Sequence, residues 1–193
     1  MPLLIGANSN EATLASNNEA SARRVLGDRY DALLDAYAAA RPNQSKRAAG
    51  TDLAEDALSI LPSLSIAAMH AANGAPSYSY YFTQVPANLR AGSAGTPHGG
   101  ELEYLFGNSD TGSVWDDADR RVSEAMASAW VRFARTGDPN PAGKRIWPRV
   151  AASGALGYQV IGTPSRIVRL SAAEEEARKL SLAASRAGWT AEP

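Results

Sequence analysis

The chain has 193 residues, of which 45% are hydrophobic and 20% charged, a composition that excludes a disordered or collagen-like chain. Its 19 lysines and arginines and 20 aspartates and glutamates leave a formal net charge of −1, which gives no electrostatic reason to expect nucleic acid or an anionic membrane as a partner. The absence of cysteine excludes disulfides, thiolate nucleophiles and cysteine-ligated metal centres, and two histidines are too few for a multi-histidine metal site.

Length and the N-terminal sequence limit the domain organisation. At roughly 150 residues per domain, the chain is one domain or one large piece of a bigger one. No uninterrupted apolar run is long enough to span a bilayer, and the opening residues MPLLIG lack the basic region and long apolar stretch of a signal peptide. We therefore expect no membrane span and no signal peptide within these residues, and the localisation stays open.

The first predicted element is a strand at residues 2–7. Its apolar run is continuous and is closed by Gly6-Ala7-Asn8, which is typical of an interior strand in a parallel sheet. Such a strand needs neighbours on both sides, and a strand this close to residue 1 has none before it in the chain. We therefore expect part of the sheet to be missing from this sequence.

A helical segment follows and ends before Arg41-Pro42, because a residue that precedes proline is pushed out of the helical region. Apolar residues at spacings of three and four predict its buried face. These residues are Leu26, Tyr30, Leu33, Leu34 and Tyr37.

The next segment predicts a linker and more helix. Residues 45–50 are basic and small and are predicted as a linker, and Thr51 or Asp52 is predicted to cap the helix that follows. Pro62 either kinks this helix or lies at the start of another one. Asn73-Gly74 predicts that the helical segment ends there, with a C-cap in the left-handed backbone conformation.

Residues 77–83 predict a strand with Tyr78, Tyr80 and Phe82 on one face. The following segment, residues 86–100, is rich in glycine, proline and serine and is predicted as a loop.

The strongest helix is predicted at residues 116–135 and is stopped by Gly137. Two short strands at 158–161 and 166–170 could form a hairpin, and Ser171 with Glu174 predicts a capping box for a terminal helix. The buried stripe of the long helix is predicted to consist of Ala118, Val122, Ala125, Met126, Ala129, Trp130 and Phe133, and the charges at 174–179 are predicted to form a solvated face.

This order of elements favours the α/β class, with parallel strands and helices packed on the sheet. So few strands of a parallel sheet are not self-sufficient.

Two polar residues stand after the predicted strands at residues 2–7 and 77–83. Glu11 follows the first strand and His98 lies in the loop after the second. Functional groups of parallel sheets gather beyond the carboxyl ends of the strands, so this carboxylate and imidazole can meet and act as an orienting acid and a general base. Taken alone, a loop glutamate is usually a solvated residue and a loop histidine is usually structural or exposed.

The other histidine and the neighbouring glutamates are predicted to have other roles. His70 lies near a helix C-terminus, where a cation interacts favourably with the helix dipole, and is taken as structural. Glu101 and Glu103 are expected to tie down the loop of His98 or to face solvent.

Four sequence blocks in a specific order resemble the C-terminal portion of type-B carboxylesterases, the cholinesterase-like branch of the α/β-hydrolases. They are PLLIGANSNE at 2–11, YSYYF at 78–82, HGGELEYLFG at 98–107 and WVRFARTGDPN at 130–140, followed by Trp147-Pro148. Together they cover residues 2–148, and residues 149–193 match only loosely. The resemblance implies the C-terminal part of an α/β-hydrolase fold over residues 1–193, incomplete without an N-terminal portion.

By this resemblance, Glu11 orients His98, and His98 is the general base for a serine that attacks a small carboxylic ester. The family order of serine, acid and histidine places the serine before residue 1. No Gly-x-Ser-x-Gly elbow occurs in the chain, and Ala91-Gly92-Ser93-Ala94-Gly95 lacks the strand and helix that an elbow needs. Ser93 is therefore rejected as the nucleophile, and the isolated chain is expected to be inactive.

The resemblance implies no metal and no organic cofactor, since a serine triad needs neither. Two alternatives stay open. One is a non-catalytic, cholinesterase-like binding or interaction module, and the other is a small helical interaction domain unrelated to esterases. If the fold is incomplete, its open sheet edge and apolar faces favour self-association of the isolated chain.

Overall fold

The computed structural model describes residues 1–11, 18–109, 112–152 and 156–189, with backbone alone for 184–189. Its centre is a four-stranded sheet in the order β1-β2-β3-β4, with strands β1 (Leu3–Asn8), β2 (Ser77–Phe82), β3 (Gly157–Ile161) and β4 (Arg166–Arg169). The first three strands are mutually parallel, and β4 pairs antiparallel with β3 as the predicted hairpin. Within the described residues β1 pairs on one side only, with β2, where the sequence predicted neighbours on both sides.

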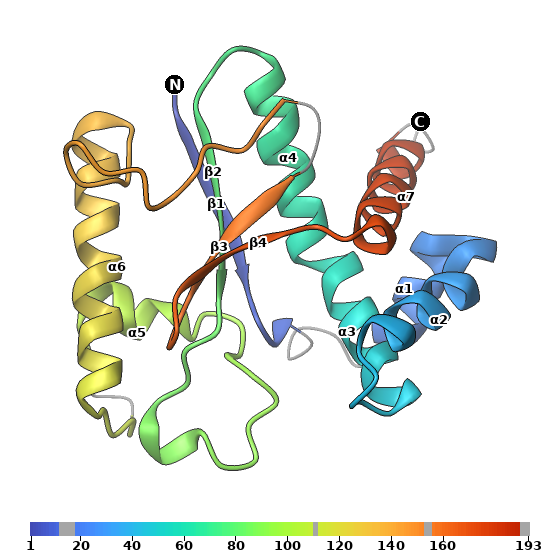
Figure 1. The fold of residues 1–193 in the computed structure, drawn as a ribbon, viewed down its shortest axis with the longest axis horizontal. Coiled ribbons are helices and arrows are strands. Elements are labelled where there is room, and N and C mark those ends of the chain that lie inside the picture. The colour runs from blue at the N-terminus through green and yellow to red at the C-terminus, as the bar shows by residue number, and fades with distance from the viewer. Residues whose placement is uncertain (12–17, 110–111, 153–155, 190–193) are drawn as a thin grey trace.

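Helices cover both faces of this sheet, and Figure 1 shows α5 and α6 on one side of it and α1–α4 with α7 on the other. None of the described helices is both long enough and apolar enough to cross a membrane. The helices are α1 (Asn18–Leu26), α2 (Tyr30–Ala40), α3 (Lys46–Leu58), α4 (Ile60–Ala72), α5 (Glu101–Phe106), α6 (Asp117–Thr136) and α7 (Ala172–Trp189), with short 3₁₀ helices η2 (Gly27–Arg29) and η3 (Ala87–Leu89).

The two faces of β2 belong to two hydrophobic cores, as the alternation of its side chains predicted. Tyr78 and Phe82 are fully buried against α5 and α6, together with Tyr104 and Met126. Tyr81 points to the other core, which α1–α4 and α7 complete. Because residues alternate between the faces of a strand, one short strand holds both helical layers in place.

The predicted linker at residues 45–50 is wrong, because α3 already begins at Lys46. Ser45 is its N-cap and accepts a hydrogen bond from the backbone N–H of Ala48 at 3.2 Å, so Thr51 and Asp52 lie inside the helix rather than at its start. Pro62 lies in the first turn of α4, where a missing N–H costs no helical hydrogen bond.

Other predicted helix ends are confirmed. The helix before Arg41-Pro42 ends at Ala40, although η2 interrupts it and splits it into α1 and α2. Gly74 adopts φ +81° after α4, and Gly137 adopts φ +74° after α6. Most of the predicted stripe of α6 faces the core, but Ala125 is exposed.

The charged start of α7 is not a simple solvated face. The capping box between Ser171 and Glu174 is present. However, Oε1 of Glu174 lies 3.5 Å from a terminal guanidinium nitrogen of Arg41, and the side chain of Glu174 is only 13% exposed. Arg178 is similarly covered and pairs with Glu175 at 2.6 Å. The sequence predicted these carboxylates to be solvated. That prediction was wrong because the residues that cover them lie far away in the sequence and leave no local signal.

Candidate active site

The site lies beyond the carboxyl ends of β1 and β2. The two strands are parallel neighbours in a register that pairs Asn8 with Phe82, so the loops that follow them leave the sheet at the same edge. The first loop carries Glu11 three residues after β1 ends, and the second carries His98. The sheet topology therefore brings together two residues that are distant in sequence.

Glu11 and His98 are in direct contact. The Nδ1 atom of His98 lies 2.6 Å from Oε2 of Glu11, within hydrogen-bond distance. The carboxylate is the more covered partner, with a side chain 17% exposed against 56% for the imidazole. The other carboxylate oxygen, Oε1, accepts the backbone N–H of Asn8 at 2.8 Å, which fixes the carboxylate toward the ring.

Asn8 joins the two loops and was not singled out by the sequence analysis. Its side-chain Nδ2 donates to the carbonyl oxygen of Pro97 at 3.0 Å and also to the carboxylate of Glu101. Asn8 is 1% exposed, so these bonds form inside the protein. Glu101 thus ties down the loop of His98, which was one of its two predicted roles.

Backbone contacts also connect the two loops. Asn10 forms a parallel bridge with Pro97, and its N–H donates to the carbonyl oxygen of Thr96 at 2.9 Å. Ser9 accepts the N–H of Thr96 on its hydroxyl at 2.9 Å. The close approach depends on Gly95, which has φ +141° and whose added Cβ would stand 2.7 Å from Ser9 Oγ. The positions of Glu11 and His98 are therefore linked through the backbone as well.

A buried carboxylate anchors the start of the His98 loop. Asp119, on α6, accepts hydrogen bonds from the side chains of Gln84 at 2.6 Å and Tyr104 at 2.9 Å, and from Arg90 at 2.7 Å. It also accepts the backbone N–H of Ala87 at 3.1 Å. Burial opposes the charged form, but these hydrogen bonds hold the pKa of Asp119 below its usual range.

Glu11 and Glu101, the two acidic side chains of the site, affect the pKa of Tyr80, a residue of β2. Burial, followed by the charges of Glu101 and Glu11, raises the pKa of Tyr80 to about 12. Its phenol therefore stays neutral beside these carboxylates.

Ser93 and His70 occupy different settings. Ser93 lies in an exposed turn and donates to the carbonyl oxygen of Gly95 at 2.9 Å, and no helix follows it as an elbow requires. The Nδ1 atom of His70 lies 2.8 Å from the hydroxyl of Ser77, where α4 leads into β2. Within the described part of the chain, no three His, Asp or Glu side chains gather as a metal site would need.

Comparison with known proteins identifies the family of the chain. The model of the Carboxylesterase family matches residues 2–179. The chain is similar to human bile salt-activated lipase, with 31% identity over 116 residues, which are 58% of this chain and 15% of that protein. It is 33% identical over 114 residues to acetylcholinesterase of Bungarus fasciatus, covering 57% of this chain and 19% of that protein.

Solved structures show the same fold. A PNB esterase superposes with a TM-score of 0.63 at 23% identity, covering 92% of this chain and 38% of that one. A thermophilic PNB esterase gives a TM-score of 0.65 at 22% identity, again covering 38% of its length. The chain thus spans well under two thirds of these proteins and has a partial α/β-hydrolase fold. Because the family model matches most of its residues, the chain belongs to the carboxylesterase family.

Proposed function

We propose that this chain supplies the acid and the general base of a serine carboxylic ester hydrolase, and that the nucleophilic serine lies outside its 193 residues. The contact of 2.6 Å between His98 Nδ1 and Glu11 Oε2 carries the proposal. Family membership supports ester hydrolysis in general, and the absence of a Gly-x-Ser-x-Gly elbow from the sequence supports the placement of the serine elsewhere.

The geometry suits the chemistry of a triad. With Nδ1 donating to Glu11, the Nε2 atom of His98 is the nitrogen left to accept a proton. It takes the proton of the serine hydroxyl as the serine oxygen attacks the ester carbonyl, and Glu11 stabilises the imidazolium that forms. The same proton then goes to the departing alkoxide, and a water molecule activated by His98 releases the acid from the acyl-serine.

The test is complementation. The purified chain is assayed on p-nitrophenyl butyrate alone and after mixing with a polypeptide that carries the serine elbow and oxyanion segment of a carboxylesterase. We expect no turnover above the buffer rate alone and measurable turnover in the mixture. In the mixture, His98→Ala should remove about 10⁶-fold of kcat and Glu11→Gln about 10⁴-fold.

Two matched variants serve as controls. His70→Gln changes the other histidine, and Glu124→Gln changes an exposed carboxylate of α6, and both should leave turnover in the mixture unchanged. Turnover that survives His98→Ala would overturn the role given to His98. Turnover by the intact chain alone would show that a nucleophile lies within it, and Ser93→Ala would then be tested first.

A further inference from the structure

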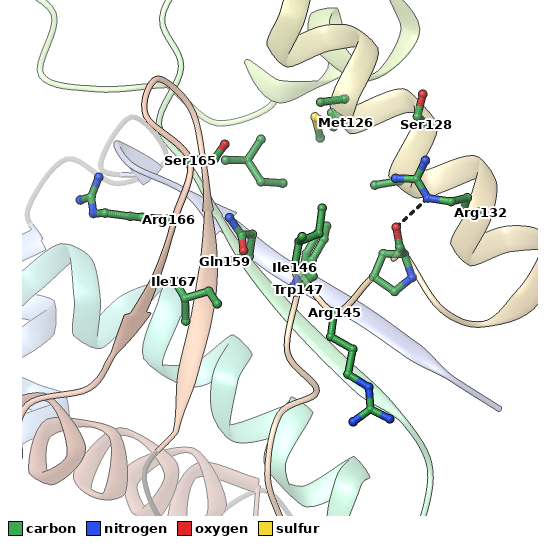
Figure 2. A pocket seen from close by; sticks show the side chains of 14 residues that line it. Met126, Ser128, Arg132, Arg145, Ile146, Trp147, Gln159, Ser165, Arg166 and Ile167 are labelled. Atoms are coloured by element: carbon green, nitrogen blue, oxygen red, sulfur yellow. Dashed lines mark hydrogen bonds between the residues drawn. The ribbon is translucent and has the colours of Figure 1, made fainter. Parts of the chain in front are cut away.

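A groove on the α6 face of the sheet lies apart from Glu11 and His98. It is bounded by α6, by the segment 139–147 and by the β3–β4 hairpin, and its volume of about 590 Å³ is in the range of small-molecule sites (Figure 2). None of its lining residues belongs to the two loops of the candidate active site. The groove is therefore separate from the residues of the proposed function.

The walls of the groove are mostly apolar. Met126 and Trp147 are buried in its floor, where they also belong to the core. Ile146 is 60% exposed and Ile167 is 47% exposed, which are high values for large aliphatic side chains that line a concavity. A ligand with an apolar chain would remove this surface from water, at about 25 cal/mol for each Å².

One cation is held at the groove. The Nε–H of Arg132 donates to the carbonyl oxygen of Pro139 at 2.8 Å, which positions the guanidinium and leaves its terminal N–H groups for other partners (Figure 2). Arg145 and Arg166 also line the groove, with side chains that extend away from Arg132 in Figure 2. Among the described residues, none of these three arginines forms an ion pair.

The groove also holds an acceptor without a protein partner. Gln159 donates through Nε2 to the carbonyl oxygen of Val160 at 2.9 Å, but its buried Oε1 has no hydrogen-bond partner within the described residues. Buried side-chain oxygens are nearly always hydrogen-bonded in folded proteins, so this atom is unusual. An unpaired cation and an unused acceptor therefore stand beside one apolar surface.

We infer that this groove binds an amphiphilic carboxylate, an acid whose alkyl chain lies along the apolar walls and whose carboxylate is bound by Arg132. The planar guanidinium pairs with a carboxylate through two parallel hydrogen bonds, and the held Nε–H leaves the outer N–H groups of Arg132 for that purpose. The mostly apolar walls, with Arg145 and Arg166 extending away from Arg132, favour one charged head with an apolar tail over a polyanion.

The test measures octanoate binding to the 193-residue chain by isothermal titration calorimetry below the micellar concentration. Octanoate should bind, whereas octanol should bind at least about tenfold more weakly, because a hydrogen bond between charged groups is lost. Arg132→Gln should weaken octanoate binding by about the same factor. Arg135→Gln is the matched control, since Arg135 is exposed on the same helix and does not line the groove.

A second variant keeps Arg132 and fills the space. Ser128 is exposed on α6 and lines the groove, so Ser128→Trp should block octanoate without disturbing the core. Circular dichroism verifies that each variant is folded. Absence of octanoate binding, equal binding of octanol, or unchanged binding by both variants would overturn the inference. So would a dimer that octanoate dissociates and Ser128→Trp abolishes, because a second copy would then be the occupant.

Discussion

Asn8 donates from its side chain to the carbonyl oxygen of Pro97, 3.0 Å away, and so joins the loop that carries Glu11 to the loop that carries His98. Its backbone N–H simultaneously holds Oε1 of Glu11 at 2.8 Å. Through its side chain and its backbone, one buried residue therefore links the positions of Glu11 and His98. The residue does this from the last position of β1, where the register with β2 fixes its backbone.

Replacing Asn8 by leucine should lower the free energy of unfolding by about 3 kcal/mol, because Pro97 and Glu101 lose a donor inside the protein. Urea denaturation measures the loss. Asn88→Leu is the control: it also removes two hydrogen bonds, but at an exposed residue, and should cost less than about 1 kcal/mol. Equal losses would mean that the buried hydrogen bonds of Asn8 stabilise the protein no more than the exposed hydrogen bonds of Asn88.

Gly95→Ala should separate the two loops and lower stability by about 2–3 kcal/mol, since the new Cβ would meet Ser9 at 2.7 Å and the backbone φ is +141°. Gly92→Ala is a matched control in the same loop, with φ +80° but nothing within 4 Å of its Cβ. Thermal melts of both variants separate backbone strain from steric contact. A Gly92 variant as unstable as the Gly95 variant would contradict the role given to the close approach.

Asp119 should make the protein sensitive to acid. Its pKa is lowered in the folded state, so its contribution to stability is present above the ordinary value of 3.8 and is lost as the pH falls through the folded-state pKa. Asp119→Asn should therefore be less stable at neutral pH and lose less stability in acid than the wild type. Denaturation curves between pH 2 and pH 7 measure both effects. Parallel curves for the two proteins would exclude this role.

Asp56 should make the protein less stable as the pH rises, the opposite of the effect of Asp119. Burial, and then the charge of Glu174, raises its pKa from 3.8 to about 7. The folded state therefore favours the protonated carboxyl, so the contribution to stability is full below pH 3.8 and is lost as the pH rises toward about 7. Asp56→Asn should flatten the decline of stability over this interval, measured by urea denaturation at a series of pH values.

Tyr37 provides a control of opposite sign. Its hydroxyl donates to Asp56 Oδ2 at 3.1 Å, and this bond lowers the pKa of Asp56. Tyr37→Phe should therefore extend the decline of stability to higher pH, whereas Asp56→Asn should flatten it. If both variants reduce the decline of stability, Asp56 is not the group that titrates.

The isolated chain should self-associate. Within the described residues, β1 pairs with a strand on one side only, and an unpaired strand edge is a template for another chain. Analytical ultracentrifugation over a range of concentrations should show oligomers that dissociate on dilution. A monodisperse monomer with one sharp melting transition would contradict this expectation.

The sequence predicted the strands, because apolar runs, alternation and turn residues are local signals. It predicted the pair of Glu11 and His98 from their places after two parallel strands and from the family resemblance. It missed Asn8, whose partners lie 89 and 93 residues away, since no local pattern marks a contact across loops. Ser45 carried a local signal, because serine is a common N-cap residue, but the basic residues Lys46 and Arg47 after it favoured a linker. Asp119 matched the pattern of a first helical turn, and only the fold shows that Gln84, Ala87, Arg90 and Tyr104 donate to it.

The described chain between β1 and β2 is long and includes α1–α4, all packed on the face away from α6 (Figure 1). The distance between Glu11 and His98, however, depends on the strand register and on the contacts between their loops. Changes of length at the turn around Pro42, between α2 and α3, can therefore be absorbed on that face without moving either residue. This crossover is the part of the protein in which evolution or an engineer could build new surface while keeping Glu11 and His98 in place.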